Sequence, residues 1–402
     1  MAAGQQGADG SAYGWVIVAA VATILAIAMG QLVNGLSVFF IPLEQEFGWP
    51  RGAIALINSF GLVGMAIGGV AMGVIADRTP IRPLCLAAAG ALGACVVLAS
   101  QATTLPQFYV LFFLAGLFGA GLFTPLLALV GNWFRTGAGL AIGIASAGQA
   151  VGQGGVPFLT AFLIESLGWR GAFLAQGMLT LAIILPLGLL LRAPPRPGGT
   201  AQALADETVP LPPVVAMVWL SAAVLFCCVC MSVPLMHLVP LIQGHGIPGP
   251  DASGVLFVML MAAIAGRVAF GKLADLIGPI PAYLTASFWQ TSAVFAFTRI
   301  HELSHFYVFA PLYGFGYAGV MTSLLVTTRS LVPASRRATA MGVVAALGWL
   351  GHGIGGFQGG YFFDLTGHYT VSYANAALAG VVNLVLVGAL LVAVRRRTPR
   401  LA

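Results

Sequence analysis

Apolar stretches of 20 or more residues recur from Tyr13 to Val394, separated by short segments rich in Gly, Pro and charged residues. Each stretch is long enough to cross a hydrocarbon core of about 30 Å as an α-helix. Only 7% of the residues are charged, whereas roughly a quarter are charged in an average soluble domain. Because so few charges cannot form a water-soluble surface, the sequence predicts an all-α integral membrane protein.

The punctuation between the apolar stretches divides the chain into twelve predicted membrane-spanning helices in two six-helix bundles. Residues 1–192 form the first predicted bundle and residues 214–402 the second. The segment between them, residues 193–213, is rich in Pro, Gly and Thr, which is typical of a solvated linker. The predicted helices lie near residues 14–42, 52–76, 81–100, 107–131, 137–164, 170–192, 213–243, 252–275, 280–299, 305–331, 337–363 and 370–394.

The distribution of Lys and Arg predicts the orientation, because cytoplasmic loops of membrane proteins carry the excess of these residues. With both termini inside, only Arg51, Arg170 and Arg299 fall on the outer side. The linker is then cytoplasmic, and the small loops favour a multi-pass protein of a bacterial inner membrane. Topology also explains the net charge of +6, since no basic cluster interleaved with aromatic residues indicates nucleic-acid binding.

The two predicted bundles repeat each other in sequence. Gly73-Val-Ile-Ala-Asp77-Arg78 corresponds to Gly271-Lys-Leu-Ala-Asp275-Leu276, and Leu167-Gly-Trp-Arg170 corresponds to Thr366-Gly-His-Tyr369. Transporters with such parallel repeats bind substrate between the two halves near the membrane midplane. We therefore expect a pseudo-symmetric transporter.

Other classes of protein have little support in the sequence. The five cysteines lie in apolar stretches without metal-ligand spacing, so we interpret them as buried thiols. We find no catalytic Ser/His/Asp spacing, no His/Glu metal cluster and no Walker lysine. We predict no cofactor, no metal, no ATP-driven step and no obligate protein partner. A membrane receptor or a membrane enzyme is the alternative from a different class.

Several motifs resemble those of known transporters. Gly73, Asp77, Arg78 and Arg82 match the loop signature G-x-x-x-D-R-x-G-R-R of the major facilitator superfamily, although residues 79–81 depart from it. Within that superfamily the chain is similar to the monocarboxylate transporter and oxalate/formate antiporter branch. The stretches that carry this likeness are Tyr13-Gly-Trp-Val16, Asn34-Gly-Leu-Ser-Val-Phe-Phe40, Gly119-Ala-Gly-Leu-Phe-Thr-Pro125, Asn132-Trp-Phe-Arg135, Gly139-Leu-Ala-Ile-Gly143 and Gly168-Trp-Arg-Gly-Ala-Phe173.

Arg267 is the main candidate for substrate binding. It lies about two thirds of the way along the predicted helix 252–275, where inserting an arginine costs roughly 2.5 to 3.5 kcal/mol. No acidic residue falls in the middle of a predicted span, so the counter-ion is expected to be the substrate. A guanidinium binds a carboxylate through two parallel hydrogen bonds. The resemblance implies the same role, and the alternative is an arginine that snorkels to the inner face beside Lys272.

The single buried cation favours monoanions over dianions. The resemblance also brings departures, because Asn34 and Ala263 replace a lysine and an acidic residue of monocarboxylate transporters, and residues 345–349 lack the lysine of oxalate transporters. We predict a secondary transporter of small lactate- or pyruvate-like monocarboxylates, with protons as co-substrate. The alternatives within transport are a carboxylate exchanger, a carrier of aromatic acids and, less favoured, a drug efflux pump.

Further polar and aromatic residues complete the predicted site. His352 and His237 are the candidates for proton coupling, since imidazole titrates near neutral pH. Each histidine has an alternative role as a hydrogen-bonded packing residue, which the sequence favours for His237. Asn34 could donate to a carboxylate or form an interhelical hydrogen bond. The remaining candidates for the cavity wall, which could equally be packing residues, are Phe123, Tyr313, Tyr317, Gln31, Gln149 and Gln153.

Charged residues at the cytoplasmic ends of two predicted helices are candidates for a gate. Asp77 and Arg78 follow the span 52–76, and Asp275 ends the span 252–275. Such exposed charges contribute little stability individually, so we expect them to bias one conformation over the other. The glycines of Gly61-x-x-Gly64, Gly68-Gly69 and Gly351-x-Gly353-x-Gly355-Gly356 predict close approach of helices.

Overall fold

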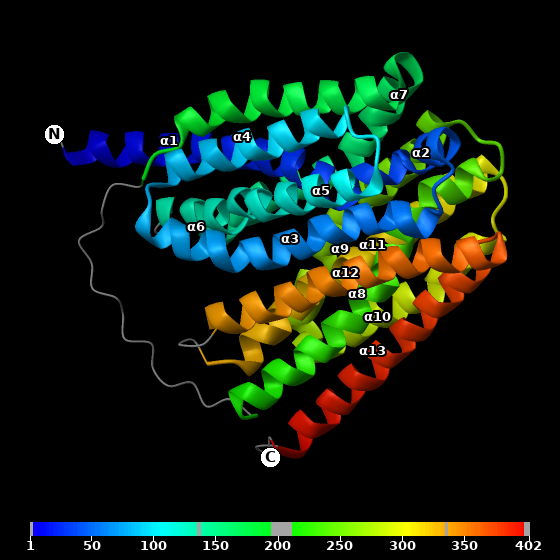
Figure 1. The fold of residues 1–402 in the computed structure, drawn as a ribbon. Helices are drawn as coiled ribbons and strands as arrows, with labels where there is room; N and C mark the ends of the chain where they lie inside the picture. The colour runs from blue at the N-terminus through cyan, green and yellow to red at the C-terminus, as the bar shows by residue number, and fades with distance from the viewer. Residues whose placement is uncertain (1–2, 135–137, 194–210, 334–336, 398–402) are drawn as a thin grey trace. The chain divides into compact units, whose positions relative to one another are not determined.

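The computed structural model describes residues 3–134, 138–193, 211–333 and 337–397, and all regular structure in these ranges is helical (Figure 1). Four short π or 3₁₀ segments interrupt or extend the α-helices: η1 (Gly30–Asn34), η2 (Gly35–Val38), η3 (Ala120–Leu122) and η4 (Phe295–Arg299). The α-helices are α1 (Ala3–Met29), α2 (Phe40–Phe47), α3 (Arg51–Arg78), α4 (Ile81–Ala99), α5 (Leu105–Gly119), α6 (Thr124–Trp133), α7 (Ala138–Leu190), α8 (Pro213–Gln243), α9 (Gly249–Ile277), α10 (Pro279–Val294), α11 (Leu303–Leu331), α12 (Arg337–Thr366) and α13 (Thr370–Arg397).

The twelve predicted spans each have a helical counterpart. Ten stretches of the described chain are long and apolar enough to cross a membrane. One of them, residues 141–190, contains two predicted spans, and α10 followed by η4 covers the short predicted span 280–299. The agreement is close in places, since the predicted span 213–243 is helix α8. The fold is therefore the predicted all-α arrangement of twelve membrane helices.

The sequence repeat is also visible in the backbone. Within α7 the chain turns at Gly168, which has φ 70° and ψ 170° and separates the fifth predicted span from the sixth. Gly367, the corresponding residue of the second repeat, has φ 74° and separates α12 from α13. Glycine is favoured at both positions because a Cβ atom disfavours positive φ. The two halves thus share a local structural solution at the same point of the repeat.

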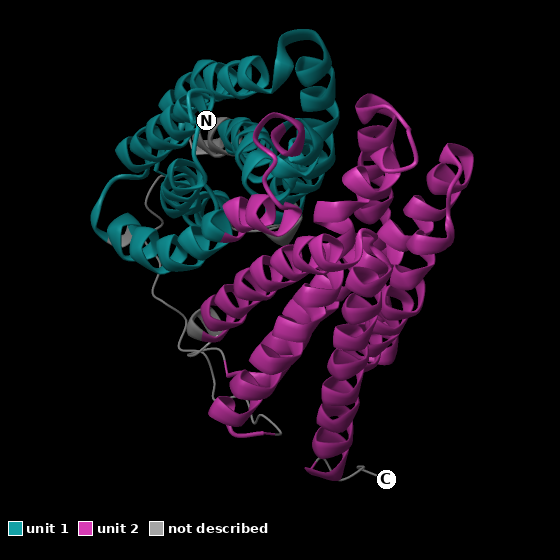
Figure 2. Cartoon of the chain, turned by 45° about the vertical axis from the view of Figure 1, so that its right-hand side comes forward, with its two compact units in different colours: residues 1–42, 60–200 teal, residues 43–59, 201–402 magenta. Residues whose placement is uncertain are grey.

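The chain forms two compact units, which Figure 2 distinguishes by colour. Unit 1 comprises residues 1–42 and 60–200, and unit 2 comprises residues 43–59 and 201–402. The segment 43–59, with the end of α2 and the first turns of α3, therefore belongs to unit 2. Most of the predicted linker, residues 193–213, lies outside the described residues, so the predicted bundle boundaries stay a prediction.

Small residues allow the helices of each unit to pack closely. In unit 1, α7 lies against α1, and a Cβ atom at Gly148 or Gly152 would overlap the backbone of Ala22 or Ala26. Gly64 and Gly68 of α3 similarly face the backbone of α5. Close backbone contact through small residues stabilises helix association in a membrane, because the surrounding lipid is as apolar as the helices and the hydrophobic effect does not drive them together.

In unit 2, α9 lies against α11 with backbones in contact. A Cβ atom at Gly266 would overlap the carbonyl oxygen of Phe315, and one at Gly314 would overlap that of Met259. The same unit pairs α8 with α12 and with α13. Because Gly266 precedes Arg267 and Phe315 lies between Tyr313 and Tyr317, the close α9–α11 contact positions the candidate residues.

Candidate functional site

Arg267 lies in α9 with its side chain half-buried. Its Nε atom is buried and has no hydrogen-bond partner among the described residues. Lys272, five residues further along α9, is exposed. A buried guanidinium nitrogen without an acceptor is energetically unfavourable, so this arginine has capacity to bind an acceptor that the described chain does not supply.

Tyr317 and Tyr313 of α11 accompany Arg267 in unit 2. Arg267 lies within electrostatic and hydrogen-bonding reach of the Tyr317 hydroxyl. The two tyrosines are four residues apart, so they share one helix face. Their rings are parallel, with 6.2 Å between centroids and 2° between planes. The buried Tyr313 hydroxyl has no partner among the described residues. We call these three residues the Arg267 cluster.

His352 lies in α12 and is half-buried. Its Nδ1 atom is 3.2 Å from the carbonyl oxygen of Gly348, one turn earlier. Because a carbonyl oxygen can only accept, Nδ1 carries the hydrogen and Nε2 has the lone pair. This geometry leaves Nε2 to take up a proton, which is compatible with the predicted coupling role.

His237 in α8 is fully buried and bonded on both sides of its ring. Nε2 is 2.7 Å from the carbonyl oxygen of Gly356, so it donates, and Nδ1 is 3.4 Å from the Tyr369 hydroxyl, from which it accepts. Burial raises the pKa of Tyr369 above its ordinary value, which keeps this hydroxyl a donor. Both nitrogens serve helix packing, and this favours a structural role for His237 over proton coupling.

The candidate binding residues from the N-terminal half of the chain, Asn34 and Gln31, lie in unit 1. Asn34 ends the π-helical segment η1, and π-segments are frequent at functional sites. Its Nδ2 atom donates to the Gln153 carbonyl oxygen at 3.2 Å, while its buried Oδ1 atom has no described partner. Gln31 is arranged in the same way. Its Nε2 atom donates to Thr180 Oγ1 at 2.7 Å, while its buried Oε1 atom has no described partner.

Two other candidates of unit 1 are less specific. Gln149 is half-buried in α7. Phe123 is half-buried at the break between η3 and α6, with φ −107° and ψ −84°. Helix breaks inside membrane spans are tolerated where the backbone is buried in protein or lines a cavity. The structure thus places Phe123 at an irregular point of the predicted span 107–131.

The predicted gate residues lie at helix ends in separate units. Arg78 is exposed at the end of α3 in unit 1, and Asp275 is exposed near the end of α9 in unit 2. The Asp77 side chain lies outside the described part of the structure, although its backbone belongs to α3. The gate stays a prediction.

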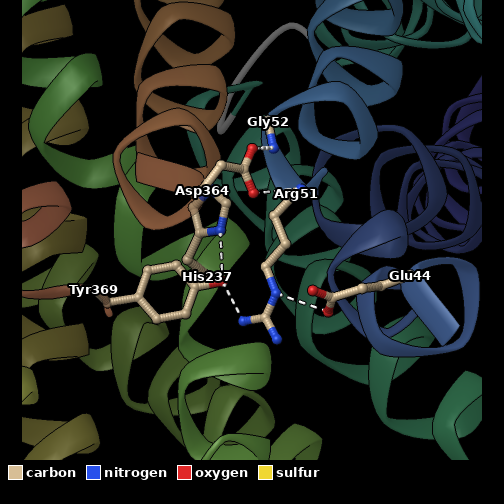
Figure 3. Close-up of polar contacts among 6 residues, drawn as sticks. All are labelled: Glu44, Arg51, Gly52, His237, Asp364 and Tyr369. Atoms are coloured by element: carbon tan, nitrogen blue, oxygen red, sulfur yellow. Dashed lines mark hydrogen bonds and ion pairs between the residues drawn. The ribbon is translucent and has the colours of Figure 1, made fainter. Parts of the chain in front are cut away.

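A polar cluster in unit 2 that the sequence does not predict centres on Arg51 (Figure 3). Arg51 Nε donates to Glu44 Oε2 at 2.9 Å, and Nη1 donates to the Tyr369 hydroxyl at 3.0 Å. The guanidinium carbon also lies 3.9 Å from the centre of the Phe363 ring. These contacts join α2, α3, α12 and the turn before α13.

Asp364 of α12 completes this cluster by capping α3. Its two carboxylate oxygens accept hydrogen bonds from the backbone N–H groups of Arg51 and Gly52, at 2.7 and 2.6 Å. These donors belong to the first turn of α3 and have no acceptor within their own helix. An anion at this end is also favoured by the helix dipole. Glu44, Arg51 and Asp364 all lie at the outer ends of predicted spans. This shared position is the one sequence signal that could have indicated the cluster.

Potential metal-ligating side chains do not gather in the described residues. They contain no group of three or more His, Cys, Asp or Glu side chains that could hold a metal ion. All five cysteines are buried and free. The candidate residues offer a guanidinium, hydroxyls and an imidazole in unit 2 and amides in unit 1, and these groups suit reversible binding of a small polar molecule.

Comparison with known proteins agrees with this architecture. The sequence matches the Major Facilitator Superfamily over residues 19–355 and 260–402. The chain belongs to this superfamily of membrane transporters, which are not enzymes. A bacterial homolog of the human lysosomal transporter Spinster, inward-facing and unoccupied, superposes with a TM-score of 0.78 at 16% identity, covering 97% of this chain and 99% of that one.

The similar proteins of known name include monocarboxylate transporters. Rat monocarboxylate transporter 13 is 27% identical over 383 residues, covering 90% of this chain and 86% of the relative. Rat monocarboxylate transporter 3 is 29% identical over 400 residues, covering 92% and 79%. The structure of a D-xylose-proton symporter has a TM-score of 0.73 at 15% identity, covering 93% and 97%. The predicted likeness to the superfamily and to its monocarboxylate branch is confirmed.

Proposed function

We propose that this chain is a secondary carrier of small monocarboxylates, in which Arg267 binds the carboxylate and two halves alternate around it. The supporting observation is the buried, unpartnered Nε of Arg267 inside a membrane-spanning helix. A carboxylate with two oxygens supplies acceptors for the guanidinium fork, and the Tyr317 hydroxyl beside it is a further donor. A dry site strengthens both interactions.

Two further observations favour a monoanion. Arg267 is the only Lys or Arg in the central part of a predicted span, so one permanent charge is available to the substrate. The curated relatives at 27% and 29% identity are named monocarboxylate transporters. Asn34 and Gln31 of unit 1 each have a buried side-chain oxygen without a described partner, and both stay predicted candidates for substrate contact.

Substrate-induced thermal stabilisation of the purified protein tests the substrate class. Lactate and pyruvate are expected to raise the unfolding temperature, because a ligand that binds only the folded state stabilises it by mass action. Acetate, oxalate and benzoate complete the panel, and glucose is the neutral control. Stabilisation by oxalate alone, or by benzoate alone, would replace the proposal with the exchanger or the aromatic-acid carrier. No response to any acid would contradict it.

Proton coupling is proposed to run through His352. In the parent, carboxylate uptake into proteoliposomes is expected to rise as the external pH falls, because a proton accompanies each anion. His352→Gln removes the titrating group, so we expect uptake that varies much less with pH, with carboxylate binding retained. His305→Gln is the matched control, since His305 is exposed at the start of α11. A parental pH profile in His352→Gln would exclude His352 from coupling.

A further inference from the structure

A second basic site lies in unit 2, away from Arg267. A cavity of about 330 Å³ opens among the loop after α8, the segment η4 to α11 and the turn between α12 and α13. Its basic and phenolic lining residues are Arg51, His245, His301, His368 and Tyr369. None of the described residues that line it is acidic. Its volume lies at the lower end of the range for small-molecule sites, roughly 300 to 1,000 Å³. We call it the Arg51 pocket.

Arg51 supplies a built anion ligand in this pocket. Its side chain is held at three points, by Glu44 at Nε, by the Tyr369 hydroxyl at Nη1 and by the Phe363 ring. Only 7% of the residue is exposed. No hydrogen bond within the described chain engages Nη2, which Figure 3 shows at the free end of the guanidinium. A fixed arginine with one open donor group binds an anion at little entropic cost.

The three histidines can add charge to the same cavity. His245, His301 and His368 are exposed, and they come from three different connections between helices. The rings of His245 and His301 are perpendicular with centroids 4.9 Å apart. Partial burial lowers the pKa of His245, and the nearby His301 lowers it further. His245 is therefore neutral at physiological pH and gains charge under acidic conditions.

The surrounding charges make anion binding depend on these histidines. Glu44 balances the charge of Arg51, and Asp364 accepts from the α3 backbone, so the floor of the pocket has little excess positive charge. Glu302 lies 3.8 Å from His305 at the start of α11, and Asp251 lies in the first turn of α9. Buried His237 is bonded to Tyr369 behind the pocket. The pocket becomes cationic only when its exposed histidines are protonated.

We propose that the Arg51 pocket is a second anion site that captures the carboxylate of a small organic acid under acidic conditions, before the acid reaches Arg267. This inference rests on the proposed function for its substrate class. The carboxylate accepts hydrogen bonds from Arg51 Nη2 and from the imidazolium N–H groups. The predicted topology places Arg51 on the outer side, where an acidic medium supplies both protons and anions.

The test for transport compares the double variant His245→Gln/His301→Gln with the parent in proteoliposomes. At pH about 5.5 we expect KM for the carboxylate to rise about tenfold with kcat unchanged, because a hydrogen bond to a charged group contributes roughly this much. At pH about 8 the two proteins should have equal KM. His305→Gln, which does not line the pocket, is the control. Equal KM at both pH values would overturn the proposal.

Direct binding separates this proposal from the function of Arg267. The probe is acetate at pH about 5.5, titrated against Arg267→Ala in zwitterionic nanodiscs, with histidine NMR signals as the readout. Saturable shifts of the His245 and His301 signals are expected, and their persistence in Arg267→Ala would support the pocket even if transport of carboxylates fails. Absent shifts would overturn it. Shifts produced by added phosphatidylglycerol and not by acetate would assign the pocket to lipid phosphate instead.

Discussion

Arg267→Lys is expected to lower kcat/KM for monocarboxylate uptake by on the order of 100-fold, equivalent to about 2.7 kcal/mol. Lysine keeps the positive charge but presents a compact ammonium, whereas the guanidinium presents parallel donors that match two carboxylate oxygens. The shorter reach also moves the charge away from the Tyr317 hydroxyl. Initial rates in proteoliposomes, normalised to the amount of reconstituted protein, measure this loss.

Lys272→Ala is the matched control for that variant. Lys272 is an exposed cation on the same helix, so its removal tests whether any positive charge on α9 supports uptake. We expect Lys272→Ala to retain uptake close to the parental rate. Near-parental uptake by Arg267→Lys would show that the carboxylate does not depend on the guanidinium fork, and the assignment of Arg267 would fall.

The helices were predictable from the sequence because the bilayer leaves few choices. Every backbone polar group in lipid must be satisfied within the protein, so a long apolar stretch becomes a helix. This is why the predicted span 213–243 coincides with α8. The turn at Gly168 was also predictable, because it interrupts an apolar region and its counterpart Gly367 stands at the matching point of the repeat.

The polar cluster around Arg51 was not predictable in the same way. Arg51 and Tyr369 are 318 residues apart, and hydropathy carries no information about which helix ends meet. From the sequence Arg51 is only an outer loop cation, and Asp364 only an acidic residue near a helix end. Their bonds depend on the placement of segment 43–59 in unit 2, which only the three-dimensional packing reveals.

Arg267 could be predicted from the sequence as a candidate binding residue, because a charge inside an apolar span is costly whatever its neighbours are. The sequence predicts its neighbours Tyr313 and Tyr317 as candidates for the cavity wall, but their parallel stacking follows only from the packing of α11. For His237 the sequence favoured a packing role, and its two hydrogen bonds support that alternative. Periodicity and composition thus locate a charged residue along a helix. Which residues it contacts or bonds to depends on the tertiary packing.

Gly266→Ala is expected to destabilise the protein by about 3 kcal/mol, the upper end of the usual cost of overpacking. The added methyl group would overlap the backbone carbonyl of Phe315, which cannot move aside as a flexible side chain can. Relief requires α9 and α11 to separate, and this separation would also draw Arg267 away from Tyr317. We therefore expect a lower unfolding temperature together with weaker stabilisation by carboxylates, both measured by tryptophan fluorescence during heating.

Gly271→Ala on the same helix distinguishes this close contact from a general effect of glycine replacement. A Cβ atom there would meet only the Thr322 methyl group at 3.6 Å, an ordinary van der Waals distance. Alanine also has the better helix propensity, so Gly271→Ala should match or exceed the parental stability. If Gly266→Ala unfolded at the parental temperature, the α9–α11 backbone contact would not limit the fold. If it unfolded early but bound carboxylates normally, the coupling of this contact to Arg267 would be refuted.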